Sequence, residues 1–391
     1  MAPTQFPGPQ KMVKVFVPKE SRVNETRVAA TPESVKKMVD AGLEVVVEAG
    51  AGAGAYFADG RYTSAGATLA ADRAAAYGEA DIVLTVGPPS SDDLAGAKAG
   101  SLLVGLLAPL QNLDLVRELQ SKEINSLAME LVPRISRAQS MDALSSQASI
   151  AGYKAVLLAA ERLGKYFPLL MTAAGTIPPA KVVVMGAGVA GLQAVATAKR
   201  LGAVVEVSDI RDVVKEQVES LGGKFIDLPD MGGGEGKGGY AREMTPEFLA
   251  EQRKIVTRHI QAADVVICTA LVPGKKAPTL VTAEMVAGMK AGSVVVDLAV
   301  EQGGNCELSK SGEDVMSDGV LILGPSNLPA ETPIDASQLY ARNVWALLQP
   351  MIKDGEITLD LEDEVVDGAL LTQAGNVHNA MTRKALEGDG A

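Results

Sequence analysis

A glycine-rich turn at residues 186–191 constrains the fold of this chain more than any other feature of its sequence. It reads Gly-Ala-Gly-Val-Ala-Gly, follows the apolar run of residues 181–185 and precedes a helical pattern at residues 192–201. A Gly-x-Gly-x-x-Gly pattern carries little weight alone, but between a strand and a helix it is typical of a dinucleotide-binding βαβ unit. The sequence therefore predicts a Rossmann-like domain around this turn.

The three glycines of the turn are expected to serve different purposes. Gly186 allows the tight turn, Gly188 lets the backbone approach a pyrophosphate, and Gly191 lets the helix pack closely on the strand. The free N–H groups at the start of the helix favour an anion, which places Val189 beside the phosphates. The turn thus predicts where a dinucleotide binds but not which one.

An acidic residue indicates the kind of dinucleotide. Asp209 follows the next strand-like run, residues 204–208, and stands about 20 residues after the glycine turn, as the fingerprint requires. A carboxylate there accepts hydrogen bonds from the ribose hydroxyls of adenosine and repels a 2′-phosphate, which favours NAD(H) over NADP(H). Two alternatives stay open, because Arg211 is the residue type that an NADP(H) site uses and because Asp209 could merely close the end of its strand.

Strands and helices alternate along the rest of the chain. At 391 residues it exceeds the size of a single core and suits two domains. The alternation predicts an α/β protein with two doubly wound, Rossmann-like domains whose sheets are mainly parallel. The predicted strands are residues 15–18, 44–48, 81–86, 101–107 and 125–129 in the first domain and 181–185, 204–208, 265–269, 293–298 and 321–323 in the second. The predicted helices of the first domain are residues 31–41, 68–77 and 112–121.

Two further helical patterns mark the domain boundaries. Residues 147–167 have no internal break and suit a connector, and residues 338–351 are expected to return the chain to the first domain. We therefore predict a discontinuous N-terminal domain, residues 1–145 plus 338–391, and a nucleotide-binding domain, residues 146–337.

A glycine-rich segment interrupts the second domain at residues 228–244. It holds six glycines between Met231 and Tyr240, a composition too flexible for a helix or a strand. Either it is a plain linker, or it is a mobile loop that closes over a bound cofactor with Tyr240.

The composition argues against several other functions. The net charge is −12 and Lys and Arg do not cluster, which argues against a nucleic-acid partner. No apolar run reaches the ~20 residues that cross a bilayer, so no direct membrane insertion is expected, and the absence of a secretory signal favours a cytoplasmic location. Cys268 and Cys306 have neither metal-ligand spacing nor a neighbouring His, so we expect buried reduced thiols and no metal site.

Four stretches of the sequence resemble the alanine dehydrogenase and transhydrogenase superfamily. They are residues 23–32, 186–191, 271–274 and 296–304, and the resemblance covers nearly the whole chain. The two branches of this superfamily differ in chemistry. An amino-acid dehydrogenase moves protons on its substrate and needs a general acid or base and a clamp for the carboxylate, whereas hydride transfer between two nicotinamides needs neither.

The residues that the dehydrogenase branch uses for proton transfer are missing. Where its members carry a Lys-Glu-Pro motif and a His, this chain has Gly87-Pro88-Pro89 and Ala108. Its two histidines, His259 and His378, lie elsewhere and are expected to serve structure, as is Arg27, which remains from the clamp. An alanine dehydrogenase-like amino-acid dehydrogenase is therefore the alternative hypothesis, and a non-catalytic NAD sensor is a third.

A polar loop between the predicted domains resembles the transhydrogenase branch residue by residue. It spans residues 133–142 and reads Pro-Arg-Ile-Ser-Arg-Ala-Gln-Ser-Met-Asp. The resemblance implies that Arg134, Gln139 and Asp142 are catalytic residues over the nicotinamide and its ribose. Asp142 can stabilise the positive charge that develops on the ring as hydride leaves. The resemblance also implies that Ser145 reaches the carboxamide, and a loop that only caps the following helix is the alternative.

The resemblance implies a wider set of nucleotide contacts, some of them through the backbone. The residues expected to bind NAD(H) are Arg134, Ile135, Ser136, Gln139, Asp142, Ser145, Gly186, Gly188, Val189, Gly191, Asp209, Ile210, Arg211, Gly239, Tyr240, Ala270 and Leu271.

The function that this resemblance implies is that of the NAD(H)-binding component of a proton-translocating NAD(P) transhydrogenase. In that family NADH on this component passes hydride, with Si/Re specificity, to NADP+ on a partner subunit. Separate membrane-spanning subunits couple the transfer to proton translocation. The resemblance further implies a homodimer that is peripheral on the cytoplasmic side of the inner membrane.

Overall fold

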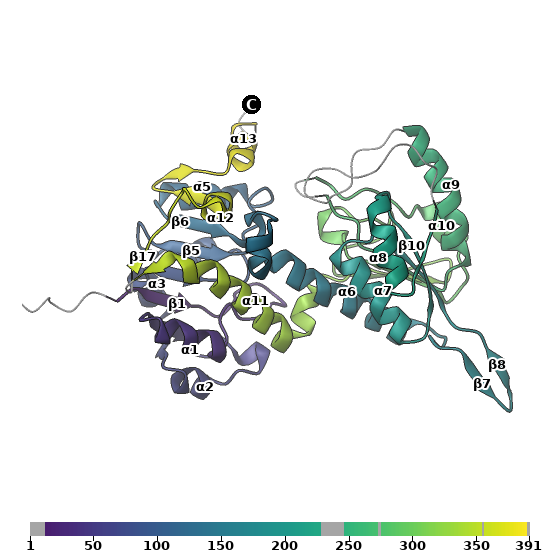
Figure 1. The fold of residues 1–391 in the computed structure, drawn as a ribbon, viewed down its shortest axis with the longest axis horizontal. Coiled ribbons are helices and arrows are strands. Elements are labelled where there is room, and N and C mark those ends of the chain that lie inside the picture. The colour runs from purple at the N-terminus through teal and green to yellow at the C-terminus, as the bar shows by residue number, and fades with distance from the viewer. Residues whose placement is uncertain (1–11, 228–245, 273–274, 354–355, 389–391) are drawn as a thin grey trace, which may run out of the picture. The chain divides into compact units, whose positions relative to one another are not determined.

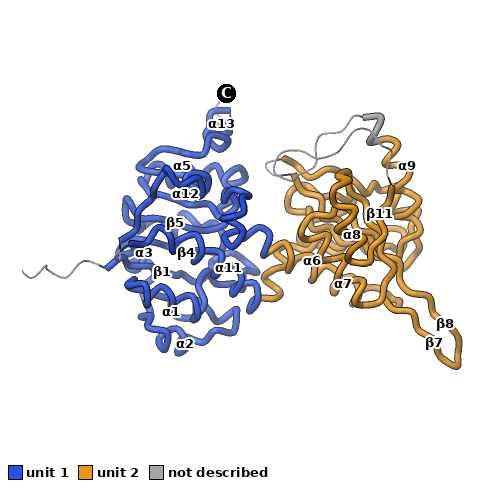
Figure 2. The backbone as a smooth tube through the Cα atoms, in the orientation of Figure 1, with its two compact units in different colours: residues 1–146, 333–391 blue, residues 147–332 orange. Residues whose placement is uncertain are grey.

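The computed structural model describes residues 12–227, 246–272, 275–353 and 356–388. The chain divides into two compact units, residues 1–146 with 333–391 and residues 147–332 (Figure 2). The return to the first unit lies at residue 333 rather than at 338. It comes earlier because the whole of helix α11 (Pro333–Leu348) belongs to the first unit, where Tyr340 and Val344 are buried in the core. The predicted mobile loop, residues 228–244, lies outside the described residues.

The first unit is built on an eight-stranded sheet with the strand order β19-β18-β6-β5-β4-β1-β2-β3. Strands β1 to β6 are parallel, whereas β18 and β19, from the returning C-terminal part of the chain, continue the sheet in antiparallel fashion beside β6. The strands are β1 (Lys14–Val17), β2 (Glu44–Glu48), β3 (Thr68–Ala70), β4 (Ile82–Leu84), β5 (Leu102–Gly105), β6 (Asn125–Ala128), β18 (Leu370–Gln373) and β19 (Asn376–Val377).

Helices cover both faces of this sheet (Figure 1). Because side chains alternate along a strand, Val15 and Val17 of β1 pack in one core with α1 and α11, and Phe16 packs in another with α3 and α5. The remaining elements of the unit are α1 (Pro32–Asp40), α2 (Asp59–Ser64), α3 (Arg73–Glu79), α4 (Ser91–Leu94), α5 (Leu113–Ser121), α12 (Glu364–Ala369), α13 (Ala380–Gly388), β16 (Ile352–Lys353) and β17 (Glu356–Ile357).

The helix predicted at residues 68–77 is wrong at its start, whereas residues 73–77 are helical as predicted. Thr68–Ala70 form the edge strand β3, which pairs in parallel with Val46–Glu48 of β2. Helix α3 begins after Asp72, whose carboxylate accepts a 3.0 Å hydrogen bond from the N–H of Ala75 and so caps the helix. The alanine-rich run is compatible with a helix, but the free edge of β2 offers it backbone partners, and tertiary context overrides local propensity.

The second unit holds a seven-stranded sheet with the order β11-β10-β9-β12-β13-β15-β14. Neighbouring strands are parallel except β14, which lies antiparallel on β15. Without β14 this is the Rossmann order, in which the strand sequence reverses between the first and the fourth strand, here β9 and β12. The strands are β9 (Lys181–Met185), β10 (Val204–Ser208), β11 (Lys224–Phe225), β12 (Val265–Cys268), β13 (Val294–Asp297), β14 (Asp314–Ser317) and β15 (Val320–Leu323).

The five strands predicted for this unit are confirmed, and helices again pack on both faces. Val182 and Val184 of β9 lie in a core with α6 and α7, whereas Val183 lies in one with α9 and α10. The predicted connector helix begins at Ala143 instead of residue 147. None of the described helices is both long and apolar enough to span a membrane. The helices are α6 (Ala143–Arg162), α7 (Val189–Arg200), α8 (Lys215–Ser220), α9 (Pro246–Ala262) and α10 (Ala283–Ala287).

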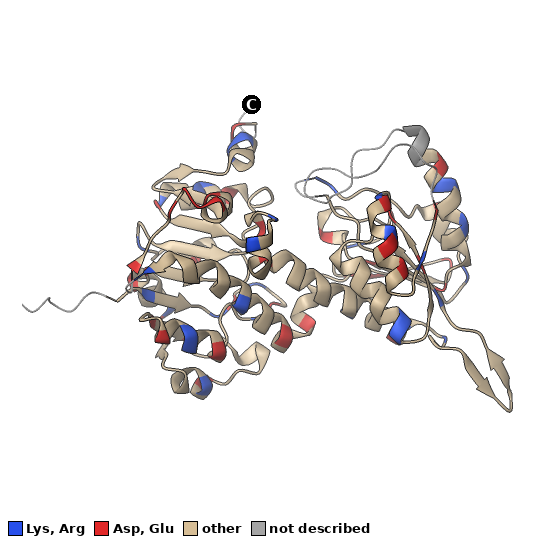
Figure 3. Ribbon diagram, in the orientation of Figure 1, with Lys and Arg blue, Asp and Glu red and all other residues tan. Residues whose placement is uncertain are grey.

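A β-hairpin that the sequence did not predict extends from the second unit. It consists of β7 (Leu170–Thr172) and β8 (Gly175–Ile177), which pair in antiparallel fashion. The hairpin carries no charged side chain (Figure 3). Met171 is 74% exposed and Leu169, just before β7, is 53% exposed. Apolar side chains are thus presented to solvent along a projecting element.

Candidate nucleotide site

The glycine turn joins the carboxyl end of β9 to the start of α7, and its glycines meet different surroundings. Gly186 has a left-handed φ of 103°. A Cβ on Gly191 would lie 1.9 Å from the carbonyl oxygen of Gly186, so α7 packs against the turn only because residue 191 has no side chain. A Cβ on Gly188 would meet no atom within 4 Å. The structure therefore assigns the turn to Gly186 and the close packing to Gly191, and it leaves open space beside Gly188.

The start of helix α7 suits a bound anion. Gly188 is the N-cap residue and offers no side chain to the first free N–H groups, and the first turn of the helix has no acidic residue. These N–H groups and the positive end of the helix dipole favour a phosphate. Val189, at the first position of the helix, is 42% exposed. The residues present therefore fit the pyrophosphate of a dinucleotide.

Asp209 is tied to the glycine turn and to Arg211. Its Oδ2 accepts a 2.7 Å hydrogen bond from the N–H of Ala187, and Arg211 donates from Nε to Oδ1 at 2.9 Å and from Nη2 to Oδ2 at 2.7 Å. The Asp209 side chain is only 5% exposed. Asp209 thus caps the carboxyl end of β10, which is one of the alternatives that the sequence leaves open. Its carboxylate also neutralises the guanidinium of Arg211, the group that would bind the 2′-phosphate of NADP(H). Ile210, between the two, is half-buried.

The carboxyl end of β12 lies against the same turn. Thr269 donates from Oγ1 to the carbonyl oxygen of Gly186 at 2.9 Å. A Cβ on Gly186 would lie 3.3 Å from the backbone nitrogen of Ala270. Leu271 is 36% exposed. The structure thus brings Ala270 beside the fingerprint, as expected of a Rossmann switch point. Two expected contacts lie outside the described residues: Gly239 and Tyr240.

Asn305 positions this segment, although no sequence pattern singled it out. Its Oδ1 accepts a 2.9 Å hydrogen bond from the N–H of Ala270, and its Nδ2 donates to the carbonyl oxygens of Ala270 at 2.9 Å and Pro278 at 2.8 Å. The side chain is fully buried. Asn305 directly follows the motif at residues 296–304, but nothing in its local sequence indicates a partner so far back along the chain.

The polar loop before α6 belongs to the first unit. It contains the 3₁₀ helix Ser136–Met141, in which Ala138 and Met141 are buried in the core of that unit. Burial of these two apolar residues leaves Arg134 and Gln139 exposed at the surface. The loop therefore presents an amide and a guanidinium while its apolar residues anchor it.

Asp142 and Ser145 lie together at the start of helix α6. Asp142 accepts a 2.8 Å hydrogen bond from the N–H of Ser145 at Oδ1 and a 2.6 Å hydrogen bond from the Ser145 hydroxyl at Oδ2. The helix-capping alternative thus describes this pair, although capping leaves carboxylate lone pairs free. Ile135 is half-buried and Ser136 is exposed.

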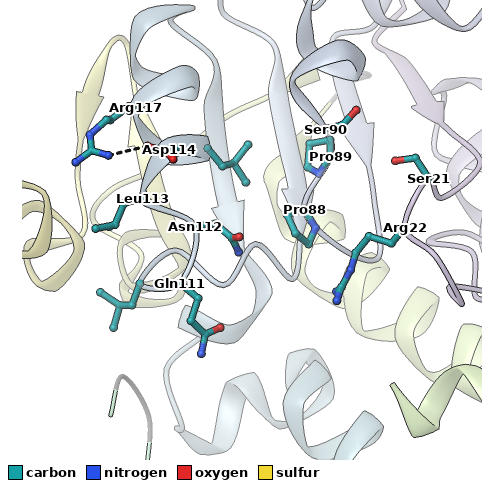
Figure 4. Close-up of a pocket in the computed structure, with 12 residues that line it drawn as sticks. Ser21, Arg22, Pro88, Pro89, Ser90, Gln111, Asn112, Leu113, Asp114 and Arg117 are labelled. Atoms are coloured by element: carbon teal, nitrogen blue, oxygen red, sulfur yellow. Dashed lines mark hydrogen bonds and ion pairs between the residues drawn. The ribbon is translucent and has the colours of Figure 1, made fainter. Parts of the chain in front are cut away.

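Gly87 and Ala108 of the first unit occupy the two positions at which the dehydrogenase branch carries its proton-transfer residues. A cavity of about 650 Å³ lies beside Pro88 and Pro89, and no lysine or histidine is among its lining residues (Figure 4). A Cβ on Gly87 would lie 3.3 Å from Cδ of Arg22, so that arginine covers the position of the missing lysine. Ala108 has only a methyl group, on a backbone with a φ of 45°. No side chain at either position can exchange a proton near neutral pH.

Arg27 is held within the protein. Its Nε and Nη2 donate to the two carboxylate oxygens of Glu25 at 2.8 and 2.6 Å. The Glu25 side chain is fully buried and that of Arg27 is 7% exposed. Arg27 and Glu25 thus form a buried ion pair, and the structural role of Arg27 stays a prediction.

Each of the two histidines lies within hydrogen-bond distance of a carboxylate. Nδ1 of His259 lies 2.7 Å from Oε2 of Glu206, and Nε2 of His378 lies 2.7 Å from Oδ1 of Asp367. His259 belongs to α9 in the second unit and His378 follows β19 in the first. Each histidine is thus paired with one carboxylate of its own unit, and their structural role stays a prediction.

Both cysteines are buried free thiols, as predicted. Burial raises the pKa of Cys306 to about 11 and that of Cys268 well above its ordinary value. The reactive form of cysteine is the thiolate, so neither residue is poised as a nucleophile.

Glu20 makes the stability of the first unit dependent on pH. Burial raises the pKa of its carboxyl to about 7, although the N–H groups of Val86 and Gly87 donate to it and oppose the shift. Between the ordinary pKa of 4.5 and about 7, the folded chain therefore holds a proton that the unfolded chain has lost. Stability falls as pH rises through this window.

We expect Glu20→Gln to flatten this dependence. Wild-type protein should lose about 2 kcal/mol of its free energy of unfolding between pH 5 and pH 8 through this group, and E20Q should lose much less. Denaturant unfolding at a series of pH values measures the difference. The exposed Glu387→Gln is the control and should behave like the wild type. If the free energy of unfolding of E20Q falls with pH as steeply as that of the wild type, Glu20 is not the group responsible.

Known protein families match both units of the chain. The family model described as the alanine dehydrogenase/PNT N-terminal domain matches residues 16–151, and the one described as the C-terminal domain matches residues 155–380. The chain is 50% identical over 388 residues to an NAD(P) transhydrogenase alpha-subunit protein of Rhodospirillum rubrum, covering 97% of this chain and all of that protein. It is 44% identical to NAD(P) transhydrogenase subunit alpha of Haemophilus influenzae, covering 92% of this chain and 71% of that protein.

Solved structures give the same result. The transhydrogenase from Sinorhizobium meliloti superposes with a TM-score of 0.85 at 46% identity, covering 93% of this chain and 99% of that one. An L-alanine dehydrogenase superposes with a TM-score of 0.80 at 28% identity, covering 97% of this chain and all of the other. The chain therefore belongs to the alanine dehydrogenase/PNT family, and its similarity to the NAD(P) transhydrogenase alpha subunits extends over nearly its whole length.

Proposed function

We propose that this chain is the NAD(H)-binding component of a transhydrogenase, in which hydride passes directly between NADH on this chain and NADP+ on a partner subunit. The observation that carries the proposal is an open dinucleotide turn at residues 186–191 combined with Gly87 and Ala108 at the two proton-transfer positions of the dehydrogenase branch. A nicotinamide exchanges hydride, but these two positions cannot move a substrate proton. The second reactant is then most simply another nicotinamide.

The second unit supplies the residues that would hold the adenosine and pyrophosphate of NAD(H). The pyrophosphate would lie at the N–H groups that follow Gly188, beside Val189. Asp209 would accept hydrogen bonds from the ribose hydroxyls and, with Arg211 bound to it, disfavour NADP(H). Ala270 borders the turn. The family resemblance adds six residues as backbone or loop contacts: Gly186, Gly191, Ile210, Leu271, Gly239 and Tyr240.

The polar loop would act at the nicotinamide end. We assign Arg134 and Gln139 to the orientation of the nicotinamide and its ribose, because both side chains are exposed on an anchored loop. Asp142 would stabilise the ring's positive charge as hydride leaves. Ser145 would bind the carboxamide, with backbone contacts from residues 135–136. These roles need no proton donor.

The assembly proposed for this chain has three parts. The chain itself would form a homodimer, supported by the exposed, uncharged hairpin of residues 170–177, since contiguous apolar surface marks interaction sites. An NADP(H)-binding subunit and membrane-spanning subunits would complete it. The name of the relatives as subunits supports the presence of partner subunits in general. We propose Si/Re-specific transfer coupled to proton translocation through those subunits, with this chain peripheral on the cytoplasmic side of the inner membrane.

A reconstituted transfer assay tests the proposal. The purified chain is mixed with the NADP(H)-binding partner, NADH and an NADP+ analogue whose reduced form absorbs at a separate wavelength. We expect reduction of the analogue at the expense of NADH only when both proteins are present. Absence of transfer would overturn the proposal. Formation of NADH from NAD+ and alanine by this chain alone would replace it with the amino-acid dehydrogenase hypothesis, and NADH binding without turnover would indicate a sensor.

We expect Gln139→Asn to slow hydride transfer at least about tenfold while the Kd for NADH changes by less than about threefold. Removing one methylene withdraws the amide by about 1.5 Å, and misplacement of that size costs large factors in rate. Single-turnover transfer and NADH titration measure the two quantities. Gln120→Asn, on the exposed side of α5, is the matched control. An equal loss of rate and affinity would make Gln139 only a binding residue.

A further inference from the structure

One side chain of helix α11 binds the backbone and a side chain on either side of Asp142. Nδ2 of Asn343 donates to the carbonyl oxygen of Ser140 at 2.8 Å, and its Oδ1 accepts from the hydroxyl of Ser146 at 2.7 Å. Asn343 is 8% exposed. It therefore spans the segment in which the 3₁₀ helix ends and α6 begins, the segment that carries Asp142 and Ser145.

A second contact from the returning C-terminal part of the chain holds the same loop. Arg137 donates from Nη1 to Oδ2 of Asp363 at 2.8 Å and from Nη2 to Oδ1 at 2.6 Å. This two-pronged pair holds the pKa of Asp363 down at about 2, chiefly through the hydrogen bonds from Arg137. Asp363 also caps α12 by accepting from the N–H of Val365 at 2.8 Å. The loop is thus bound at residue 137 and again around residue 142.

We propose that Asn343 is a positioning residue for hydride transfer, acting through the backbone of Ser140 and the hydroxyl of Ser146 to fix the direction of Asp142. The inference rests on the proposed function of the loop. It also gives a physical reason for the discontinuous first unit, because the chain must return after residue 332 to bring α11 against the loop.

Asn343 suits this purpose better than the ion pair does. An amide has one donor side and one acceptor side, so it distinguishes the carbonyl of Ser140 from the hydroxyl of Ser146 and fixes which group lies on which side. The Arg137 side chain is 49% exposed, and exposed pairs contribute little free energy. The buried amide is therefore the contact to which we assign the direction of Asp142.

The substitution Asn343→Asp isolates the effect. The carboxylate can still accept from Ser146 but places an oxygen against the carbonyl oxygen of Ser140, so one hydrogen bond becomes a repulsion. Asn125→Asp is the matched control. Asn125, at the amino end of β6, also donates from Nδ2 to a carbonyl, that of Gly100, at 2.9 Å and accepts from the N–H of Ala374 at 3.0 Å.

For folded N343D we expect the single-turnover rate with the partner subunit to fall about tenfold or more, with the Kd for NADH within about threefold of the wild type. N125D should keep the wild-type rate. The emission of bound NADH, which reports on the nicotinamide surroundings and needs no partner, should change in N343D only. Asn343→Ala, which removes both hydrogen bonds without adding charge, serves if N343D does not fold.

The outcomes separate this inference from the proposed function. A wild-type rate and unchanged NADH emission in N343D would overturn the positioning role even if wild-type protein transfers hydride. Equal losses of rate in N343D and N125D, in step with lowered thermal midpoints, would also overturn it and leave Asn343 a structural residue. If wild-type protein transfers no hydride but N343D alters the emission of bound NADH, the proposed function fails and the positioning of the loop stands.

Discussion

Replacing Gly188 with alanine is expected to weaken NADH binding about 100-fold, or about 2.7 kcal/mol, while leaving the thermal midpoint of the protein unchanged. A Cβ at residue 188 meets no protein atom within 4 Å, and the backbone φ of −76° is one that alanine adopts freely. The methyl group therefore costs the fold nothing. It occupies the space through which a pyrophosphate would approach the free N–H groups of α7. Titration of NADH fluorescence and differential scanning calorimetry measure the two quantities.

The contrast with Gly191→Ala makes this prediction specific. A Cβ at residue 191 would lie 1.9 Å from the carbonyl oxygen of Gly186, so α7 must move away from the turn. We expect G191A to lose thermal stability together with NADH binding, unlike G188A. If G188A binds NADH as tightly as the wild type, the nucleotide does not approach the turn at residue 188. That result would contradict the placement of the pyrophosphate at the glycine turn.

The elements of the site that local sequence determines were predictable. Gly186 has a left-handed φ, and Gly191 lies against the carbonyl oxygen of Gly186. Both requirements arise within the turn, so the pattern and its flanking strand and helix placed it without knowledge of the fold. The five strands of the second unit followed for a similar reason. Strands buried on both faces are near-continuous apolar runs, as in Val182–Val184 and Val294–Val296.

The elements that depend on distant partners were not predictable. Asn305 and Asn343 find their hydrogen-bond partners far along the chain, at Ala270 and at Ser140, and neither residue stands in a pattern that marks it. The same cause explains the error at residues 68–77, where the edge of β2 converts a run with helical composition into a strand. The β7–β8 hairpin contributes nothing to a buried core and therefore leaves no periodic signal in the sequence.

The carboxylate of Asp142 illustrates a third case, in which two interpretations of one residue are compatible. Helix capping and a contact to the nicotinamide were opposed as alternatives for the polar loop. The structure shows the capping bonds from Ser145, which restrict the carboxylate to one orientation. A catalytic carboxylate benefits from such restriction, because preorganised groups cost no reorganisation when charge develops. Capping at this position therefore supports the proposed role.

Replacing Asp209 with alanine is expected to weaken NADH binding about 10- to 100-fold and to remove the preference for NADH over NADPH. The carboxylate accepts from Ala187 in the glycine turn and from Arg211. Hydrogen bonds to a charged group contribute about 1.5 to 3 kcal/mol, so D209A loses both the ribose acceptor and the support of the turn. Arg211 loses the neighbouring charge of Asp209 at the same time, which favours its attraction to a 2′-phosphate. Parallel titrations with NADH and NADPH measure the preference.

The double substitution Asp209→Ala with Arg211→Ala separates the two causes. If Arg211 supplies the new affinity for NADPH, the double variant should keep the loss of NADH binding and lose the gain for NADPH. The ionic strength of the buffer gives a further check, because attraction between a guanidinium and a phosphate at a partly exposed site weakens as salt is added. D209A should therefore lose its NADPH affinity with rising salt more steeply than the double variant. Unaltered preference for NADH in D209A would mean that the Asp209–Arg211 pair does not select the nucleotide and serves only to join β10 to the glycine turn.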